Sequence, residues 1–481
     1  MEASGPGRRD FIRAAGLTVG AASIHGLLHA AETRARKTTG PNVVFVLADQ
    51  WRRQAAGYSG DPNALTPNLD KLAARSVNLT NAVSTCPVCS PYRASLLTGQ
   101  YPLTHGVFLN DVCLSPKGAT LAEAYAHAGY DTAYIGKWHL DGHGRASYIP
   151  RERRHGFDYW KVLECTHNYN RSFYYAADSK TRLTWSGYDV RAQTDDARAY
   201  IRTRASGSKP FILVLSFGPP HNPYQTAPKK YRELYNDKKL KLRENVPPSA
   251  RGRARKDLAG YYAHISALDA CVGDLLDTID KAGISDNTIF VFTSDHGDML
   301  GSRGMSRKQK PWDESIMVPF LLRYPAAKPR AIDMPISTPD IMPTLLGLSG
   351  IKIPKSVEGV DYSGVLLGRQ QPSSDAALIT CVSPFGEWHR GQGREFRGIR
   401  TRWYTYVRDL KGPWLLYDNQ QDPYQLNNLA GKDDSADLQK RLDSLLAGKL
   451  QAAGDDFLPG TKYIDKWGYK VNSRGTVPYT N

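Results

Sequence analysis

The 481-residue sequence predicts an α/β protein with a large, mostly parallel sheet between layers of helices, and a smaller C-terminal α+β subdomain with an antiparallel sheet. Between residues 42 and 348, continuous apolar segments alternate with helical patterns, which is typical of strands buried on both faces of a sheet. From residue 396 onward, polar and apolar residues alternate instead, as they do in antiparallel strands.

The central strands are predicted from short apolar segments rich in β-branched residues. These segments are residues 42–48, 131–135, 210–215 and 288–293, with a shorter strand near 77–82. Helices are expected between them, at residues 66–72, 121–128, 258–282 and 339–348. The first helix has Thr66 as its cap and Pro67 in its first turn, where a missing N–H costs nothing.

The C-terminal part has its own pattern. Antiparallel strands are expected within residues 396–407 and 414–417, followed by a terminal helix at 437–450. A change of composition near residues 368–375 indicates a linker. We therefore predict a main domain at residues 38–372 and a C-terminal subdomain at residues 373–481.

The first 37 residues are set apart from the fold. Arg8, Arg9 and Phe11 precede a mildly apolar segment, which resembles a twin-arginine export signal. That segment is interrupted by two histidines and is too weak for a stable membrane span. The resemblance implies export by the twin-arginine machinery to the periplasm or the medium; the other interpretation is a tail that is merely basic.

The composition is that of a globular protein with a formal net charge of +16, which favours polyanionic partners. No zinc-finger spacing, RNA-binding signature or basic zipper is present in the sequence, so nucleic acid is not expected and a sulfated polysaccharide is the better candidate. The six cysteines are scattered, which indicates neither a disulfide framework nor a zinc site.

Residues of catalytic type stand at the ends of the predicted strands. Asp49, His139, His221 and Asp295 each lie at the C-terminal end of a separate apolar strand. In α/β sheets, ligands bind beyond the carboxyl ends of the strands, so we expect these side chains to meet at one edge and form an active site.

A thiol is predicted at the start of a helix. In Cys89-Ser-Pro91-Tyr-Arg93, Pro91 suits a first helical turn, so the helix begins close to Cys89. The positive end of the helix dipole, together with Arg93 one turn later, favours an anion there and activates the thiol. The alternative is a buried structural cysteine.

The same residues, followed by Leu97-Thr98-Gly99, resemble the signature of the type I, formylglycine-dependent sulfatases of the alkaline phosphatase-like superfamily. Tyr92 departs from this signature, in which Ser or Ala is commoner. The resemblance implies that a formylglycine-generating enzyme oxidises Cys89 to formylglycine (3-oxoalanine), whose hydrate is the nucleophile. It extends over residues 42–429, which makes residues 38–372 a catalytic domain.

The resemblance also implies a metal site. Asp49-Gln50 and Asp295-His296 match the two metal motifs of the family, and residue 89 supplies a further oxygen. Mostly oxygen ligands suit Ca²⁺, with Mg²⁺ or Mn²⁺ as alternatives. His296 is either a ligand or a hydrogen-bonding group behind the ligands.

The remaining implied active-site residues are basic: Arg93, Lys137, His139, His221 and Lys308, with Lys310 as the alternative to Lys308. By the mechanism of the family, Arg93 and Lys137 hold the hydrated residue 89. His221 and Lys308 bind the sulfate group, and one of them protonates the leaving oxygen. His139 then takes the proton whose removal expels sulfate.

The predicted reaction is hydrolysis of a sulfate ester on a polysaccharide or oligosaccharide fragment. An insertion at about residues 145–195 is rich in aromatic residues and arginine, which suits either the core of a small subdomain or contacts with a sulfated sugar. His167, His389 and Arg390 are candidate sugar contacts. Two alternatives stay open: a phosphodiester or phosphonate monoester hydrolase of the same superfamily, and a catalytically inactive protein that binds sulfated glycans.

Overall fold

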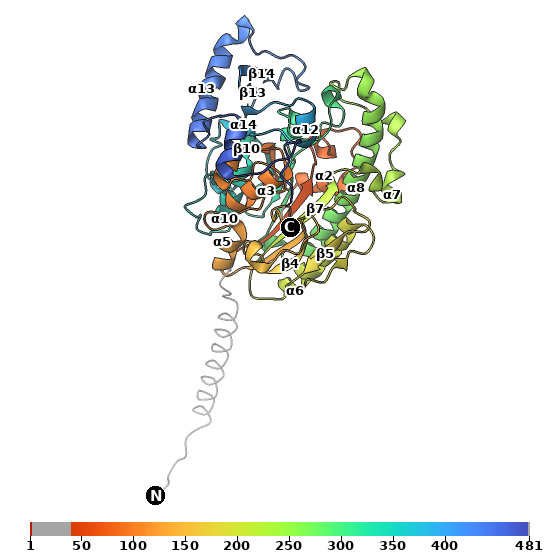
Figure 1. Ribbon diagram of the computed structural model, residues 1–481. Helices are drawn as coiled ribbons and strands as arrows, with labels where there is room; N and C mark the ends of the chain where they lie inside the picture. The colour runs from red at the N-terminus through yellow and green to blue at the C-terminus, as the bar shows by residue number, and fades with distance from the viewer. Residues whose placement is uncertain (2–39, 480–481) are drawn as a thin grey trace. The chain divides into compact units, whose positions relative to one another are not determined.

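The computed structural model describes Met1 and residues 40–479. The main sheet of this part has ten strands and is mixed in direction (Figure 1). Its order is β10-β2-β9-β8-β1-β7-β3-β4-β5-β6. The predicted central strands are confirmed: β1 (Asn42–Asp49), β3 (Asp131–Lys137), β7 (Phe211–Pro220) and β8 (Thr288–Ser294). They are mutually parallel, with β1 between β7 and β8, and β3 on the far side of β7.

The edges of the sheet are mixed in direction. On one side, β9 (Phe320–Arg323) runs antiparallel to both β8 and β2 (Val77–Val83), and β10 (Arg330–Ser337) is parallel to β2. On the other side, β4 (Tyr159–Leu163) is parallel to β3, whereas β5 (Phe173–Ala176) and β6 (Leu183–Thr184) turn antiparallel.

Two layers of helices cover the faces of the sheet (Figure 1). One layer contains α3 (Cys89–Thr98), α5 (Leu121–His127) and α10 (Ile341–Leu348), and the other contains α2 (Pro67–Ala73), α6 (Asp189–Ala205) and α8 (Arg251–Lys281). In β1, Val43, Phe45 and Leu47 pack with the first layer, whereas Val44, Val46 and Ala48 pack with the second. Burial on both faces explains why this strand is apolar throughout.

Two helix starts differ in detail from the predictions. Helix α8 begins at Arg251 rather than at 258, because its first turns are basic and solvated and lack the apolar period that marks a helix in the sequence. Thr66 does precede α2, but its hydroxyl makes no capping bond to the helix backbone. It donates to Asp70 Oδ1 and accepts from the Gly57 N–H instead.

The aromatic insertion is part of the main sheet. Strands β4, β5 and β6 lie within it and extend the sheet beyond β3. Phe157, Trp160, Tyr169, Tyr175 and Trp185 are buried, so these rings serve the core. Of the two predicted roles, packing therefore accounts for most of the large rings.

An antiparallel sheet of four strands forms the C-terminal part of the described chain, as predicted. Its strands are β11 (Ala376–Cys381), β12 (Phe396–Thr401), β13 (Tyr404–Asp409) and β14 (Gly412–Asp418). Helix α13 (Ala436–Ala452) packs on one face through Leu442 and Leu446, beside β13 and β14 in Figure 1. The other face packs on Trp312, Ile316 and Met317.

Several features lie outside these predictions or outside the described residues. Helices α12 (Gly386–Arg390) and α14 (Gly460–Trp467) were not predicted. The domain boundary at residue 372 stays a prediction. The proposed export signal lies, apart from Met1, outside the described residues. In the described part of the chain, no helix is both long and apolar enough to cross a bilayer.

Candidate active site

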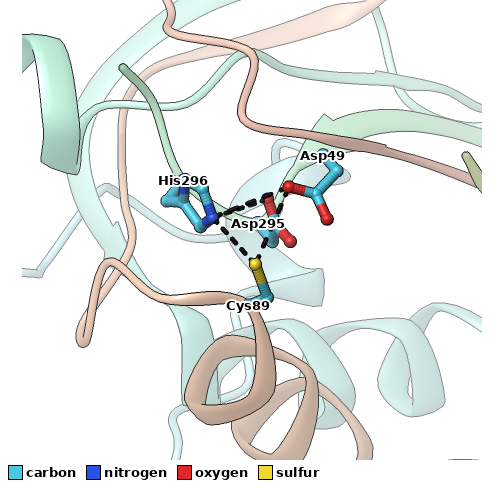
Figure 2. A group of neighbouring side chains, drawn as sticks. All are labelled: Asp49, Cys89, Asp295 and His296. Atoms are coloured by element: carbon cyan, nitrogen blue, oxygen red, sulfur yellow. Dashed lines mark hydrogen bonds and ion pairs between the residues drawn. The ribbon is translucent and has the colours of Figure 1, made fainter. Parts of the chain in front are cut away.

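Four side chains that could hold a metal ion meet at the carboxyl ends of β1 and β8 and the start of α3 (Figure 2). They are Asp49, Cys89, Asp295 and His296, all buried, and their ligand atoms lie within 4.8 Å of one another. Because β1 and β8 are neighbouring parallel strands, the residues that follow them reach the same edge of the sheet. We call these four residues the metal cluster.

Each carboxylate of the metal cluster has one oxygen held by a cationic side chain. Lys137 Nζ lies 2.5 Å from Asp49 Oδ2. Arg93 Nη2 lies 3.3 Å from the same oxygen and 3.2 Å from Asp295 Oδ2. The two Oδ1 atoms instead face His296 Nε2, at 3.7 and 3.6 Å. One oxygen of each carboxylate is therefore directed into the cluster.

Gln50 adds an amide oxygen to the cluster. Its backbone has a φ of +69°, a strained region for a residue with a side chain, and its N–H donates to Asp295 Oδ1 over 3.0 Å. The side-chain Nε2 donates to Asp298 Oδ2 over 2.7 Å and to the Tyr224 hydroxyl. With the nitrogen engaged there, Oε1 faces Lys308 Nζ at 3.5 Å and is available as a ligand.

The pKa values reflect the crowding of buried anions. Burial raises the pKa of Asp295 to about 6, and the charge of Asp49 adds to the increase. Burial also acts to raise the pKa of Asp49, but Lys137 and other cationic side chains outweigh it and hold that pKa well below its usual range. A divalent cation would relieve the repulsion between the two carboxylates, and the donor set is mostly oxygen. The residues therefore fit a metal such as Ca²⁺.

Cys89 is the first residue of α3, as predicted. Its Sγ lies 3.2 Å from both Lys308 Nζ and His296 Nε2. Burial and Asp49 act to raise the pKa of the thiol, but Lys137, Lys308 and His296 outweigh them and lower it well below its usual value. The neighbouring Tyr92 is buried and packs in the apolar layer that contains α3, so the departure from the signature is accommodated in the core.

Lys308, not Lys310, reaches the cluster. Its Nζ lies 2.9 Å from His221 Nε2. His221 Nδ1 lies 2.9 Å from the Asn222 carbonyl and must donate to it, so Nε2 accepts from the lysine. Burial and the charge of Lys308 keep the pKa of His221 well below its usual value. Lys310 Nζ turns away, onto the Lys308 carbonyl and over the ring of Trp388.

His139 forms a dyad with Asp111, a residue that the sequence did not indicate. His139 has a φ of +61°, and its Nε2 lies 2.9 Å from Asp111 Oδ1. The hydroxyl of Tyr479 donates to the same carboxylate, and Arg145 lies 3.6 Å from its other oxygen. Burial opposes the charge of His139, but Cys165 and the hydrogen bond to Asp111 outweigh it and raise its pKa to about 10.

The three predicted sugar contacts divide into two groups. The ring of His167 stacks on that of His221, with centroids 4.8 Å apart, and so lies beside the site. Its side chain is exposed at the surface, and partial desolvation by its neighbours, with the charges of Lys137 and Lys308, lowers its pKa. His389 and Arg390 are exposed in α12, and no contact among the described residues joins them to the metal cluster. Their role in sugar binding stays a prediction.

Comparisons with known proteins identify the family. A family model described as Sulfatase matches residues 41–351, and one described as N-sulphoglucosamine sulphohydrolase, C-terminal, matches residues 301–452.

The chain belongs to the sulfatase family.

Its relatives agree with this assignment. An ulvan-active sulfatase of Formosa agariphila is 47% identical, over 92% of this chain and 87% of its own. An endo-4-O-sulfatase of Bacteroides thetaiotaomicron is 32% identical, over 81% of this chain and 88% of its own. A solved Bacteroides fragilis structure, described as the sulfatase yidJ, is 31% identical with a TM-score of 0.80, and covers 89% of this chain and 98% of that one. The sulfatase therefore has the alkaline phosphatase-like fold that its sequence predicted.

Sequence reasoning missed the residues that support the sulfatase site from a distance. Asp111 lies in a loop with no strand before it, and Tyr479 lies near the C-terminus, so no local pattern connects either of them with His139. Asp298 orients Gln50 through its hydrogen bond. In the sequence, only its place directly after the second metal motif hinted at a role.

Within this sulfatase, replacing Asp111 with Asn is expected to lower kcat about 100-fold with little change in KM, because the dyad that orients and charges His139 is lost. Asp111 stabilises the imidazolium and raises the pKa of His139, so its removal lowers that pKa and moves the pH–rate profile to lower pH. The measurement is the pH dependence of kcat and KM on an aryl sulfate. Asp286→Asn, at an exposed position, is the matched control. An unchanged kcat and profile in Asp111→Asn would contradict this role.

Proposed function

We propose that this sulfatase removes sulfate from a sulfated carbohydrate, a polysaccharide or oligosaccharide fragment, with formylglycine at position 89 and a divalent cation, for which Ca²⁺ is the best match. The observation that carries the proposal is the thiol of low pKa at the start of α3, enclosed by the metal cluster, Lys137 and Lys308. The names of the relatives support a carbohydrate substrate, since one acts on ulvan and is 47% identical.

Residue 89 is the proposed nucleophile. A formylglycine-generating enzyme would convert its CH₂–SH side chain to an aldehyde, and water adds to give two hydroxyls on one carbon. One hydroxyl attacks the sulfur of the ester, and loss of the proton from the other expels sulfate and restores the aldehyde. A sulfate ester formed on an unmodified cysteine or serine would have no second hydroxyl whose deprotonation could expel the sulfate. The donor set of Asp49, Gln50, Asp295 and His296 would hold the cation, which when bound acts as a Lewis acid toward the sulfate group.

Cationic side chains would stabilise the charge that develops on the sulfate oxygens. That task belongs to His221 and Lys308, whereas Arg93 and Lys137 are fixed by their bonds to the two carboxylates and are preorganised to hold the hydrated residue 89. Between His221 and Lys308, the geometry favours Lys308 as the acid for the leaving sugar oxygen. His221 is neutral and accepts from the lysine, so the proton available for transfer is on Lys308 Nζ.

His139 would complete the cycle. The thiol of Cys89 contributes to the raised pKa of His139, and conversion to formylglycine removes this contribution. The neutral ring then takes the proton from the second hydroxyl of residue 89, and Asp111 stabilises the imidazolium that forms. This assignment gives the acid and the base of the reaction to different loops, one after β3 and one after β8.

The location and the remaining contacts belong to the same proposal. The net charge of +16 favours an anionic polymer as substrate. His167, stacked on His221, is in a position to contact the sugar that carries the sulfate. Export by the twin-arginine machinery to the periplasm or the medium rests on the N-terminal motif.

The test is an assay of sulfate release by protein made together with a formylglycine-generating enzyme. The substrates are ulvan oligosaccharides, sulfated glycosaminoglycan oligosaccharides, an aryl sulfate and an aryl phosphodiester. We expect sulfate release from at least one sulfated saccharide, faster than hydrolysis of the phosphodiester. Faster hydrolysis of the phosphodiester than of every sulfate ester would favour the phosphodiesterase alternative. Binding of glycans without turnover, by protein that carries the aldehyde, would favour the inactive binding protein.

A further inference from the structure

A second cationic cavity lies apart from the metal cluster. It has a volume of about 340 Å³, and none of the metal-cluster residues lines it. Its walls come from the loop after β1, from residues 241–243 and from the C-terminal sheet with the loop that follows it. Five cationic side chains line it: Arg52, Arg53, Lys241, Arg243 and Arg400.

The acidic groups at this cavity are already engaged. Arg400 forms a two-pronged ion pair with Asp313, with N–O distances of 3.1 and 3.2 Å. Arg243 Nε lies 2.9 Å from Glu314 Oε1. Asp61 accepts from the hydroxyl of Tyr262 and from the Asn63 backbone. Two of the five cationic side chains are therefore neutralised by carboxylates.

Arg52 and Arg53 have no directly bound carboxylate in the described part of the chain, although the charges of Asp61 and Glu314 act on Arg52 from further away. Neither guanidinium forms an ion pair with a carboxylate of the described residues, although Arg52 is 2% exposed. The Nε atoms of both are buried and have no hydrogen-bond partner within the described chain. Burial lowers the pKa of Arg53 despite the nearby Asp313, which reflects a charge held away from water. Arg52 is buried and Arg53 is half-buried, so the cavity holds two adjacent guanidinium groups, neither with an anion of the described chain bound directly to it. Because a buried guanidinium is stabilised by a bonded anion, this arrangement favours an anionic partner at the cavity.

We propose that this cavity is a second oxyanion-binding site, in which Arg52 and Arg53 bind a sulfate or carboxylate group. Guanidinium groups present paired N–H donors that match the oxygens of such groups. Lys241, exposed at the rim, adds a further positive charge. The oxyanion comes from a distant unit of an anionic polysaccharide or from free inorganic sulfate; both present the same chemistry to the two arginines.

The backbone links this cavity to the metal cluster without sharing ligands. The Arg52 N–H donates to the Tyr261 hydroxyl, which in turn donates to the carbonyl of Gln50. The second site therefore lies directly behind the loop that carries the first metal motif. The proposal does not require formylglycine, a metal or turnover, so its failure and that of the proposed function are separate results.

The test is calorimetric titration of the full-length protein with inorganic sulfate. Arg53→Gln is the main variant, because Arg53 is only partly buried and is not in the catalytic machinery. Arg202→Gln removes an equal charge from an exposed position on α6 and is the matched control. We expect Arg53→Gln to bind one sulfate fewer per chain than the wild type, with the control unchanged. Equal stoichiometry and affinity in all three proteins would overturn the proposal.

Two further measurements complete the test. Lys241 is exposed, so folding does not depend on its side chain. Lys241→Gln should weaken sulfate binding at this cavity about tenfold, as expected for the loss of one charge-assisted contact. This variant tests the proposal if Arg53→Gln does not fold. KM for a sulfated oligosaccharide and for an aryl sulfate separates the two sources. A rise in KM for the oligosaccharide alone identifies a unit of the polysaccharide, and unchanged KM values with loss of sulfate binding identify free sulfate.

Discussion

Replacing Cys89 with alanine is expected to abolish sulfate release while leaving the protein folded. Cys89 is 1% exposed and begins α3, where alanine fits without strain. Loss of the side chain removes the proposed nucleophile, so kcat should fall about 10⁵-fold or more, as it does when other enzymes lose theirs. Arg93 and Lys137 stay in place, because their bonds to Asp49 and Asp295 do not involve the thiol.

Two measurements belong to this experiment. The first is kcat on an aryl sulfate, with Cys113→Ala as the control, because Cys113 is a half-buried cysteine with a raised thiol pKa. The second is the mass of the peptide that contains residue 89, which distinguishes an aldehyde from a thiol. Full activity in Cys89→Ala, or a thiol at position 89 throughout fully active native protein, would contradict the formylglycine mechanism. A thiol that becomes an aldehyde only after Tyr92→Ser would show that Tyr92 hinders conversion.

Removal of divalent cations is expected to have the second largest effect. Without a cation, the carboxylates of Asp49 and Asp295 face each other in a buried site, and the sulfate group loses its Lewis acid. Chelation should lower kcat about 10³-fold and should also lower the melting temperature, because a ligand that binds the folded state stabilises it. Ca²⁺ should restore both, and Mg²⁺ or Mn²⁺ should restore them less well.

The pH dependence of cation binding follows from the same residues. The pKa of Asp295 is raised to about 6, so protons compete with the cation as the pH falls through that value, and the affinity should drop. Asp295→Asn should weaken Ca²⁺ binding about 100-fold and remove most of this pH dependence. Calorimetric titration measures both, with Asp286→Asn as the control. Undiminished activity and melting temperature in protein that elemental analysis shows to be free of metal would exclude the site.

The sequence determined the framework of this protein, because the relevant signals are local. A strand buried on both faces must be apolar at every position, so β1, β3, β7 and β8 could be recognised one by one. Parallel strands end at one edge, so the polar residues directly after them, Asp49 and Asp295 among them, could be expected to meet. The start of α3 at Cys89 followed from Pro91 and the residues around it.

Only the tertiary structure decided which groups face the metal cluster and which support it from behind. Lys308 and Lys310 are equivalent by spacing, but the backbone turn at Arg307 and Gln309, both with positive φ, directs Lys308 to Cys89 and Lys310 to Trp388. Asp111, with Tyr479 bound to it, reaches His139 from loops far away in the chain. Likewise, the tertiary structure places no carboxylate of the described residues within ion-pair distance of the guanidinium groups of Arg52 and Arg53. Contacts between distant segments have no period and no fixed spacing, so a sequence pattern cannot indicate them; the tertiary packing of the chain determines them.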